Sequence, residues 1–99
     1  MINKKYSPKG KSCKVTFELP ADAAAESVAV LGEFNNWDPA ANTLALKKKK
    51  GVWTTTVSLK PGNEYAFRYL ADGNEWSNDE DADRVEANTY GTTNSVIAL

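Results

Sequence analysis

The sequence predicts an all-β protein that folds as an antiparallel sandwich. Apolar and polar residues alternate with a period of two along much of the chain, which is typical of strands with one buried face. Turn-forming residues separate these stretches at intervals of roughly 8 to 12 residues, a spacing that indicates a sandwich. No segment has the length of a stable independent helix.

The first clear strand covers residues 13–19, in which every second residue is apolar. Residues 21–26 are too few for a stable helix and predict a single turn or loop. A second strand is expected over residues 27–34. It runs into the turn-rich segment 35–39, where Pro39 disfavours continuation of the strand.

The middle of the chain predicts a β-hairpin. A short apolar alternation at residues 44–46 and a longer one at residues 53–59 lie on either side of a run of lysines, residues 47–50, which ends at Gly51. We interpret the lysines as an exposed turn rather than as a patch that binds phosphate or a membrane.

The C-terminal half predicts two further strands. In residues 65–71 the odd-numbered side chains form one apolar face, so Arg68 is expected on the opposite face. Asp72 and Gly73 give a tight-turn signal, and the segment 77–91 is polar. A β-branched strand is expected over residues 95–99.

The length of 99 residues predicts one domain. We expect residues 1–11 to form a flexible N-terminal tail and residues 12–99 to form the sandwich. The longest apolar run, residues 28–31, is far short of the roughly 18 residues that span a bilayer. We therefore expect no membrane partner. The N-terminus lacks the apolar stretch of a signal peptide, which favours a cytoplasmic location.

Composition excludes several classes of function. With no histidine and a single cysteine, the chain cannot build a zinc site, an iron–sulfur site or a nucleophile–histidine triad, and no cofactor is expected. The net charge is −1, with an excess of +4 in residues 1–50 and −5 in residues 51–99. Neither half has the concentrated basic surface that nucleic-acid binding requires.

The tryptophans fall into two groups. Trp53 is in phase with the apolar face of its strand and is expected in the core. Trp37 and Trp76 lie in or beside turns that are rich in amide and hydroxyl side chains. An exposed indole can stack on the C–H face of a pyranose while neighbouring amides bind its hydroxyls. The pattern equally allows the two rings to close the ends of the sandwich.

An acidic stretch covers residues 79–83, in which alternate aspartates match ligand positions of an EF-hand loop. The match fails further along, because Arg84 stands in place of the glycine and Tyr90 in place of the final glutamate. We therefore favour a solvated loop over a calcium site. Paired carboxylates could also cleave a glycosidic bond, but a cleft that distorts a sugar usually needs a larger scaffold. We expect no enzyme activity.

Three ordered motifs resemble carbohydrate-binding module family 48. They are Leu31-Gly32-Glu33-Phe34-Asn35-Asn36-Trp37, then Tyr65-Ala66-Phe67-Arg68-Tyr69 with Asp72-Gly73 and Trp76, then Asn88-Thr89-Tyr90-Gly91-Thr92-Thr93-Asn94-Ser95-Val96. This family includes the glycogen-binding domain of the AMP-activated kinase beta subunit and the early-set domain of isoamylases and branching enzymes. The resemblance covers residues 13–99 and implies an immunoglobulin-like sandwich of the early-set type that binds α-1,4-glucan.

The resemblance also implies a set of carbohydrate-binding residues. It places stacking rings at two tryptophans, a basic residue between them, a residue that pushes through a glucan ring, and a hydrogen-bonding amide with a threonine beside it. In the same order these are Trp37, Trp76, Arg68, Tyr90, Asn94 and Thr92. Two of them depart from the kinase domain, which has lysine in place of Arg68 and leucine in place of Tyr90. A tyrosine at this position favours stacking beside the sugar.

The sequence therefore predicts a noncatalytic module that binds glycogen, starch or maltooligosaccharides by tryptophan stacking. One alternative is a protein-interaction module that docks a glycogen-metabolising enzyme or a kinase. Another is a detached early-set domain of an amylolytic enzyme. The presence of both turn tryptophans together with Arg68 and Asn94 favours sugar binding over a docking role.

Overall fold

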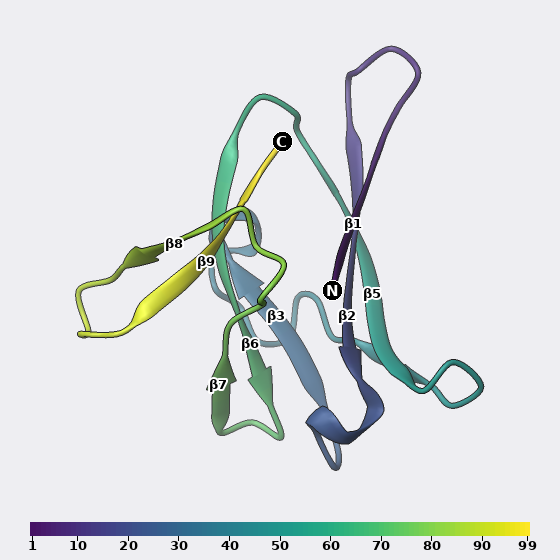
Figure 1. The fold of residues 1–99 in the computed structure, drawn as a ribbon, viewed down its shortest axis with the longest axis vertical. Helices are drawn as coiled ribbons and strands as arrows, with labels where there is room; N and C mark the ends of the chain where they lie inside the picture. The colour runs from purple at the N-terminus through teal and green to yellow at the C-terminus, as the bar shows by residue number, and fades with distance from the viewer.

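The computed structural model describes residues 1–99 as two antiparallel sheets, which confirms the all-β sandwich. One sheet has four strands in the order β1-β2-β5-β4. The other has five, in the order β3-β6-β9-β8 with β7 also paired to β6. In Figure 1 strands β1, β2 and β5 lie on the right, and β6 to β9 lie on the left. No helix in the structure has the length and apolar character needed to cross a membrane.

The strands follow most of the predicted alternations, and short 3-10 turns occupy two of the connections. The strands are β1 (Ile2–Tyr6), β2 (Cys13–Pro20), β3 (Val28–Gly32), β4 (Ala45–Lys47), β5 (Val52–Leu59), β6 (Glu64–Ala71), β7 (Glu75–Ser77), β8 (Arg84–Ala87) and β9 (Thr93–Ala98). The turns are η1 (Ala21–Ala23) and η2 (Glu33–Asn35). The predicted turn after β2 and the predicted lysine hairpin between β4 and β5 are both confirmed.

The core lies between the two sheets and is rich in aromatic rings. Phe17 of β2 packs edge-on against Phe67 of β6, with ring centroids 5.1 Å apart, and Tyr69 packs against both. Trp53 of β5 is 6% exposed, and its indole Nε1 donates a hydrogen bond of 3.1 Å to the carbonyl of Ala21. The core position expected for Trp53 is confirmed.

The N-terminal residues differ from the sequence expectation. Residues 1–11 were expected to form a flexible tail, but Ile2–Tyr6 is strand β1, paired with β2 so that Lys4 lies opposite Val15. Lys4 faces the gap between the sheets, and its Nζ binds Asp83 at 2.7 Å and the carbonyl of Ala98 at 2.9 Å. An inward lysine at a sheet edge breaks the apolar pattern from which strands are recognised.

Three further differences concern individual strands. No strand was expected over β7, the short strand that carries Trp76. The polar segment 77–91 contains strand β8, which has few apolar residues and is defined by its pairing with β9. The strand expected over residues 27–34 ends at Gly32, where η2 begins. A Cβ atom on Gly32 would lie 2.6 Å from the carbonyl oxygen of Ala66, so only glycine lets β3 approach β6 so closely before the chain turns away.

Candidate functional site

Arg68 and Trp76 meet on the outer face of the five-stranded sheet, the face turned away from the core. Side chains alternate along β6, so Phe67 and Tyr69 enter the core while Arg68 points outward. Trp76 of β7 lies opposite Leu70 in the register and shares this outer face. The Arg68 guanidinium lies over the Trp76 indole, with Cζ 5.3 Å from the ring centroid. The structure therefore brings Arg68 and Trp76 into direct contact, as a cation–π pair.

The Arg68 side chain has no hydrogen-bond acceptor within the protein. Its Nε atom is buried yet makes no hydrogen bond, the only side-chain atom of which this is true. A buried polar group without a partner costs free energy, and such groups are rare in native proteins. The two terminal Nη groups of Arg68 are not buried and make no hydrogen bond within the protein either. These Nη groups are the donors that a ligand with acceptor oxygens can reach beside the exposed ring.

The turn between β6 and β7 holds Trp76 in place. Asp72 begins this turn in the left-handed region, with φ of 52°, and its carboxylate accepts hydrogen bonds from three consecutive backbone N–H groups, those of Ala25, Glu26 and Ser27. These hydrogen bonds lower the pKa of Asp72 below its usual value. The charged carboxylate thus ties the hairpin that carries Trp76 to the segment before β3.

Trp37 lies in the loop that follows β3 and η2. Asn36 and Trp37 both have left-handed backbones, with φ of 56° and 58°, a conformation that is uncommon for a bulky aromatic residue. The Trp37 N–H donates to the carbonyl of Gly32 at 3.0 Å. The side chain of Asn35 supports the loop, accepting from the Gly32 N–H at 2.9 Å and donating to the carbonyl of Val30 at 2.9 Å. This strained backbone presents the indole to solvent, where it is 36% exposed.

Tyr90 lies in the loop between β8 and β9 and is the most exposed large apolar side chain, at 89%. The same loop carries Thr92, and Asn94 follows on β9. All three are tied together by Asn88, a residue that the sequence analysis did not single out. An asparagine two residues before a turn residue is a known signal for side-chain capping of a backbone turn, and it could have identified Asn88.

The strand register relates these groups to one another. Ser95 of β9 pairs with Phe67 of β6, so the adjacent residues Asn94 and Arg68 both lie on the outer face. Gly32, where the Trp37 loop begins, also pairs with Phe67, from the other side of β6. No hydrogen bond or ring contact joins Trp37 to the Arg68–Trp76 pair. The expected residues thus form one contact pair, one asparagine-bound loop and a separate tryptophan loop.

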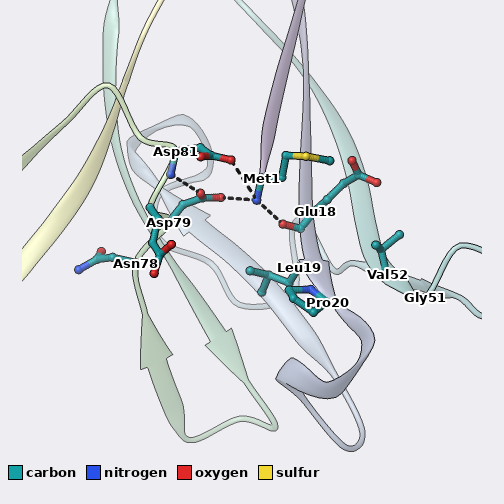
Figure 2. A pocket seen from close by; sticks show the side chains of 10 residues that line it. Met1, Glu18, Leu19, Pro20, Gly51, Val52, Asn78, Asp79 and Asp81 are labelled. Carbon is teal, nitrogen blue, oxygen red and sulfur yellow. Dashed lines mark hydrogen bonds and ion pairs between the residues drawn. The ribbon is translucent and has the colours of Figure 1, made fainter.

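One hollow of the molecule lies away from these residues. It has a volume of about 540 Å³ and lies between residues 18–20, residues 51–52 and residues 78–81 (Figure 2). The Met1 ammonium group occupies it, bound to the carbonyl of Glu18 at 2.6 Å and to Asp79 at 3.1 Å. None of the six residues expected to bind sugar lines this hollow.

The acidic stretch 79–83 is not a solvated loop throughout, and that interpretation is wrong for Asp79. This residue is 6% exposed, and its carboxylate accepts hydrogen bonds from the Tyr69 hydroxyl at 2.6 Å and from the Asp81 N–H at 2.8 Å. Burial and the neighbouring carboxylate raise the pKa of Tyr69. Asp83 instead binds Lys4 and the Ala98 N–H. No group of three metal-binding side chains lies close enough together to hold an ion.

Comparison with known proteins gives a family match over most of the chain. A family model described as the glycogen recognition site of AMP-activated protein kinase matches residues 10–99. The match includes all six residues that the sequence analysis expected to bind sugar.

Curated relatives match over shorter segments. A 1,4-alpha-glucan branching enzyme of Halothermothrix orenii is 40% identical over 57 residues, which is 57% of this chain and 9% of the enzyme. The branching enzyme of Bordetella pertussis is 41% identical over 51 residues, or 50% of this chain and 7% of the enzyme. That of Marinobacter nauticus is 39% identical over 44 residues, 43% of this chain and 7% of the enzyme. The chain thus spans less than a tenth of these relatives.

Proposed function

The chain belongs to the family of the glycogen recognition site of AMP-activated protein kinase, and from this premise we propose that it is a noncatalytic module that binds α-1,4-glucans. Glycogen, starch and maltooligosaccharides are the expected ligands. The observation that carries the proposal is the outer face of the five-stranded sheet, where Arg68 lies over the 47% exposed ring of Trp76 and its Nη groups make no hydrogen bond within the protein.

Stacking supplies most of the binding free energy in this proposal. An indole that covers one glucose face removes about 100 Å² of apolar surface from water, which contributes about 2.5 kcal/mol. Trp76 and Trp37 are the two half-exposed indoles of the chain. The rigid turns that hold both rings reduce the cost of ordering them when a sugar binds.

Polar groups on the same face fix the orientation of the glucan. Arg68 has unused donors beside Trp76. The strand register places Asn94 on the same outer face, and Thr92 lies in the adjoining loop. Tyr90, almost fully exposed at the loop tip, is placed to stack beside a glucose ring. The six residues Trp37, Arg68, Trp76, Tyr90, Thr92 and Asn94 are therefore our proposed carbohydrate-binding set.

The side chains near this surface support a noncatalytic role. Glycoside hydrolysis needs two carboxyl groups on either side of the scissile bond. The carboxylate next to Asn94 in the register is Glu86 of β8, and it is paired with Arg84 at 3.4 Å. Arg84 also pairs with Glu64. These carboxylates are occupied by structural ion pairs on the sheet.

The relatives favour one alternative, in which the module serves as the early-set domain of an enzyme that acts on α-glucans. The relatives are named as branching enzymes, and each match covers a small part of the enzyme. In that case the sandwich docks a glycogen-metabolising protein, and the outer face need not bind sugar. The two functions differ in whether the module by itself binds a glucan.

Isothermal titration of the protein with maltoheptaose tests the proposal, with cellohexaose as the β-linked control. Because association costs about 4 kcal/mol or more, we expect a Kd of about 10 μM to 1 mM for maltoheptaose and no measurable binding of cellohexaose. Absence of maltoheptaose binding, or equal binding of both sugars, would overturn the proposal in favour of docking. Incubation with amylose should release no reducing ends above a buffer blank.

A further inference from the structure

One side chain, Asn88, organises the whole loop between β8 and β9. Its Oδ1 atom accepts hydrogen bonds from the backbone N–H groups of Tyr90 at 3.0 Å and Thr92 at 3.2 Å. Its own backbone N–H donates to the carbonyl of Thr92 at 3.0 Å. The loop is therefore closed on Asn88 from both its backbone and its side chain, although Tyr90 itself has few contacts and is almost fully exposed.

These contacts fix which way the Asn88 amide faces. A backbone N–H group can only donate, so the atom of Asn88 that meets Tyr90 and Thr92 must be the carbonyl oxygen. The Nδ2 group then lies 2.8 Å from the Thr92 hydroxyl, which is also 3.1 Å from Oδ1, and 3.1 Å from the Asn94 side chain. The orientation of Asn88 follows from the backbone alone.

The same reasoning fixes the orientation of Asn94. Because Asn88 Nδ2 can only donate, the Asn94 atom that meets it must be the carbonyl oxygen Oδ1. The Nδ2 group of Asn94 is thus turned away from Asn88, and it makes no hydrogen bond within the protein. It belongs to the outer face that also carries Arg68, whose donors are likewise unused.

We infer that Asn88 is a positioning residue of the proposed α-glucan site, an inference that rests on the proposed function. Asn88 holds the Tyr90 loop in shape and turns the Asn94 amide so that its N–H donors face the sugar. Together with Arg68 the surface then offers donors from two neighbouring strands. The hydroxyl oxygens of a glucan can accept these hydrogen bonds.

The substitution Asn88→Asp separates the two roles. A carboxylate still accepts from the Tyr90 and Thr92 N–H groups, so the loop should keep its shape. It also presents an oxygen to Asn94, which must turn its Nδ2 inward and its carbonyl outward. We expect slow amide hydrogen exchange at Tyr90 and Thr92 to persist, while affinity for maltoheptaose falls about tenfold, the loss expected for one hydrogen bond to the ligand.

Two further variants complete the test. Asn88→Ala should speed the exchange of both amides and also weaken maltoheptaose binding. Asn63→Ala is the matched control, because Asn63 is an exposed turn asparagine whose side chain makes only a 3.5 Å contact with the carbonyl of Pro61. It should change neither the exchange rates nor the affinity.

The outcomes distinguish this inference from the proposed function. If the unaltered protein binds maltoheptaose and Asn88→Asp binds it equally well, Asn88 does not position Asn94 and the inference is overturned. The inference also fails if Asn88→Ala leaves the Tyr90 and Thr92 amides protected. If the unaltered protein does not bind maltoheptaose, the proposed function itself fails, and the sugar-directed role of Asn88 fails with it.

Discussion

Trp53 and Trp76 are the same residue type in opposite environments. Trp53 is 6% exposed between the sheets, and its Nε1 is satisfied by the Ala21 carbonyl. Trp76 is 47% exposed on the outer face, and the arginine over it has a buried Nε with no partner in the protein. Trp53 is buried and its polar atom is hydrogen-bonded within the protein. Trp76 is exposed, and the arginine that covers it has no hydrogen-bond acceptor within the protein.

This difference separates stability from function within one small sandwich. Burial of Trp53 stabilises the fold because its ring leaves water and its one polar atom is paired. The outer face gains no comparable stability from Trp76, since half of the ring remains in water and Arg68 lacks an acceptor. A ligand that covers the Trp76 ring and accepts hydrogen bonds from Arg68 would supply the missing burial and the missing acceptor. The comparison therefore predicts that substitutions in the two regions have opposite effects.

The largest expected effect is the loss of stability on truncating the buried ring. Trp53→Ala leaves a cavity between the sheets and should lower the free energy of unfolding by about 3 to 5 kcal/mol, a large share of the total for a domain of this size. Denaturant unfolding measures this. Trp53→Phe should cost less, because it keeps most of the apolar volume. An unfolding curve for Trp53→Ala equal to that of the unaltered protein would contradict a core role.

The exposed tryptophans should behave in the opposite way. Trp37→Ala and Trp76→Ala each remove a half-exposed ring and should weaken maltoheptaose binding by about 1 to 3 kcal/mol. Their unfolding free energies should stay close to that of the unaltered protein. Calorimetric titration beside thermal unfolding checks both effects. A variant that unfolds the domain would make that ring structural, and a variant that binds sugar normally would remove that ring from the proposed site.

Arg68→Ala should have a smaller effect, again on binding. The substitution removes the donors beside Trp76 and should cost about 1 to 2 kcal/mol of affinity. Because Arg68 Nε has no partner in the protein, no acceptor is left unpaired and stability should hardly change. The same titration and unfolding measurements apply. A fall in stability without a fall in affinity would assign Arg68 to the fold instead.

The smallest expected effect concerns the turn that carries Trp76. The folded pKa of Asp72 is lowered, so its contribution to stability is present above its unfolded value of about 3.9 and is lost as the pH falls through the lower folded value. Asp72→Asn should lower Tm by a few degrees at pH 7, and the difference from the unaltered protein should shrink below about pH 4. A Tm difference that does not change with pH would contradict this role of the charge.

Local alternation was enough to predict the strands that line the core. Residues 13–19, 53–59 and 65–71 all place their apolar face inward as expected, because burial of one face is what the alternation reflects. The outward direction of Arg68 followed from the same pattern. Strands β1 and β8 were missed, because they lie at sheet edges and carry charged residues, and their pairing depends on distant parts of the chain. Strand β7 was missed because its three residues are too few to show an alternation.

The roles of two polar residues were also beyond the sequence pattern. In the sequence Asp79 belongs to an acidic segment typical of a surface loop. In the structure it binds the Tyr69 hydroxyl of strand β6 and the Met1 ammonium group. Met1 lies at the other end of the chain, so no local pattern could indicate this contact. In the sequence Asn88 is one polar residue of a loop motif among several. Its importance comes from the orientation of its amide, which depends on the folded loop.

The most direct test of the comparison follows the three indole N–H signals in a ¹H–¹⁵N spectrum during titration with maltoheptaose. The account predicts that the signals of Trp37 and Trp76 shift in a saturable way while that of Trp53, bound to the Ala21 carbonyl, stays in place. Cellohexaose should move none of them. A titration in which Trp37 and Trp76 do not respond, or in which cellohexaose shifts them equally, would contradict the claim that the exposed tryptophans bind α-glucan.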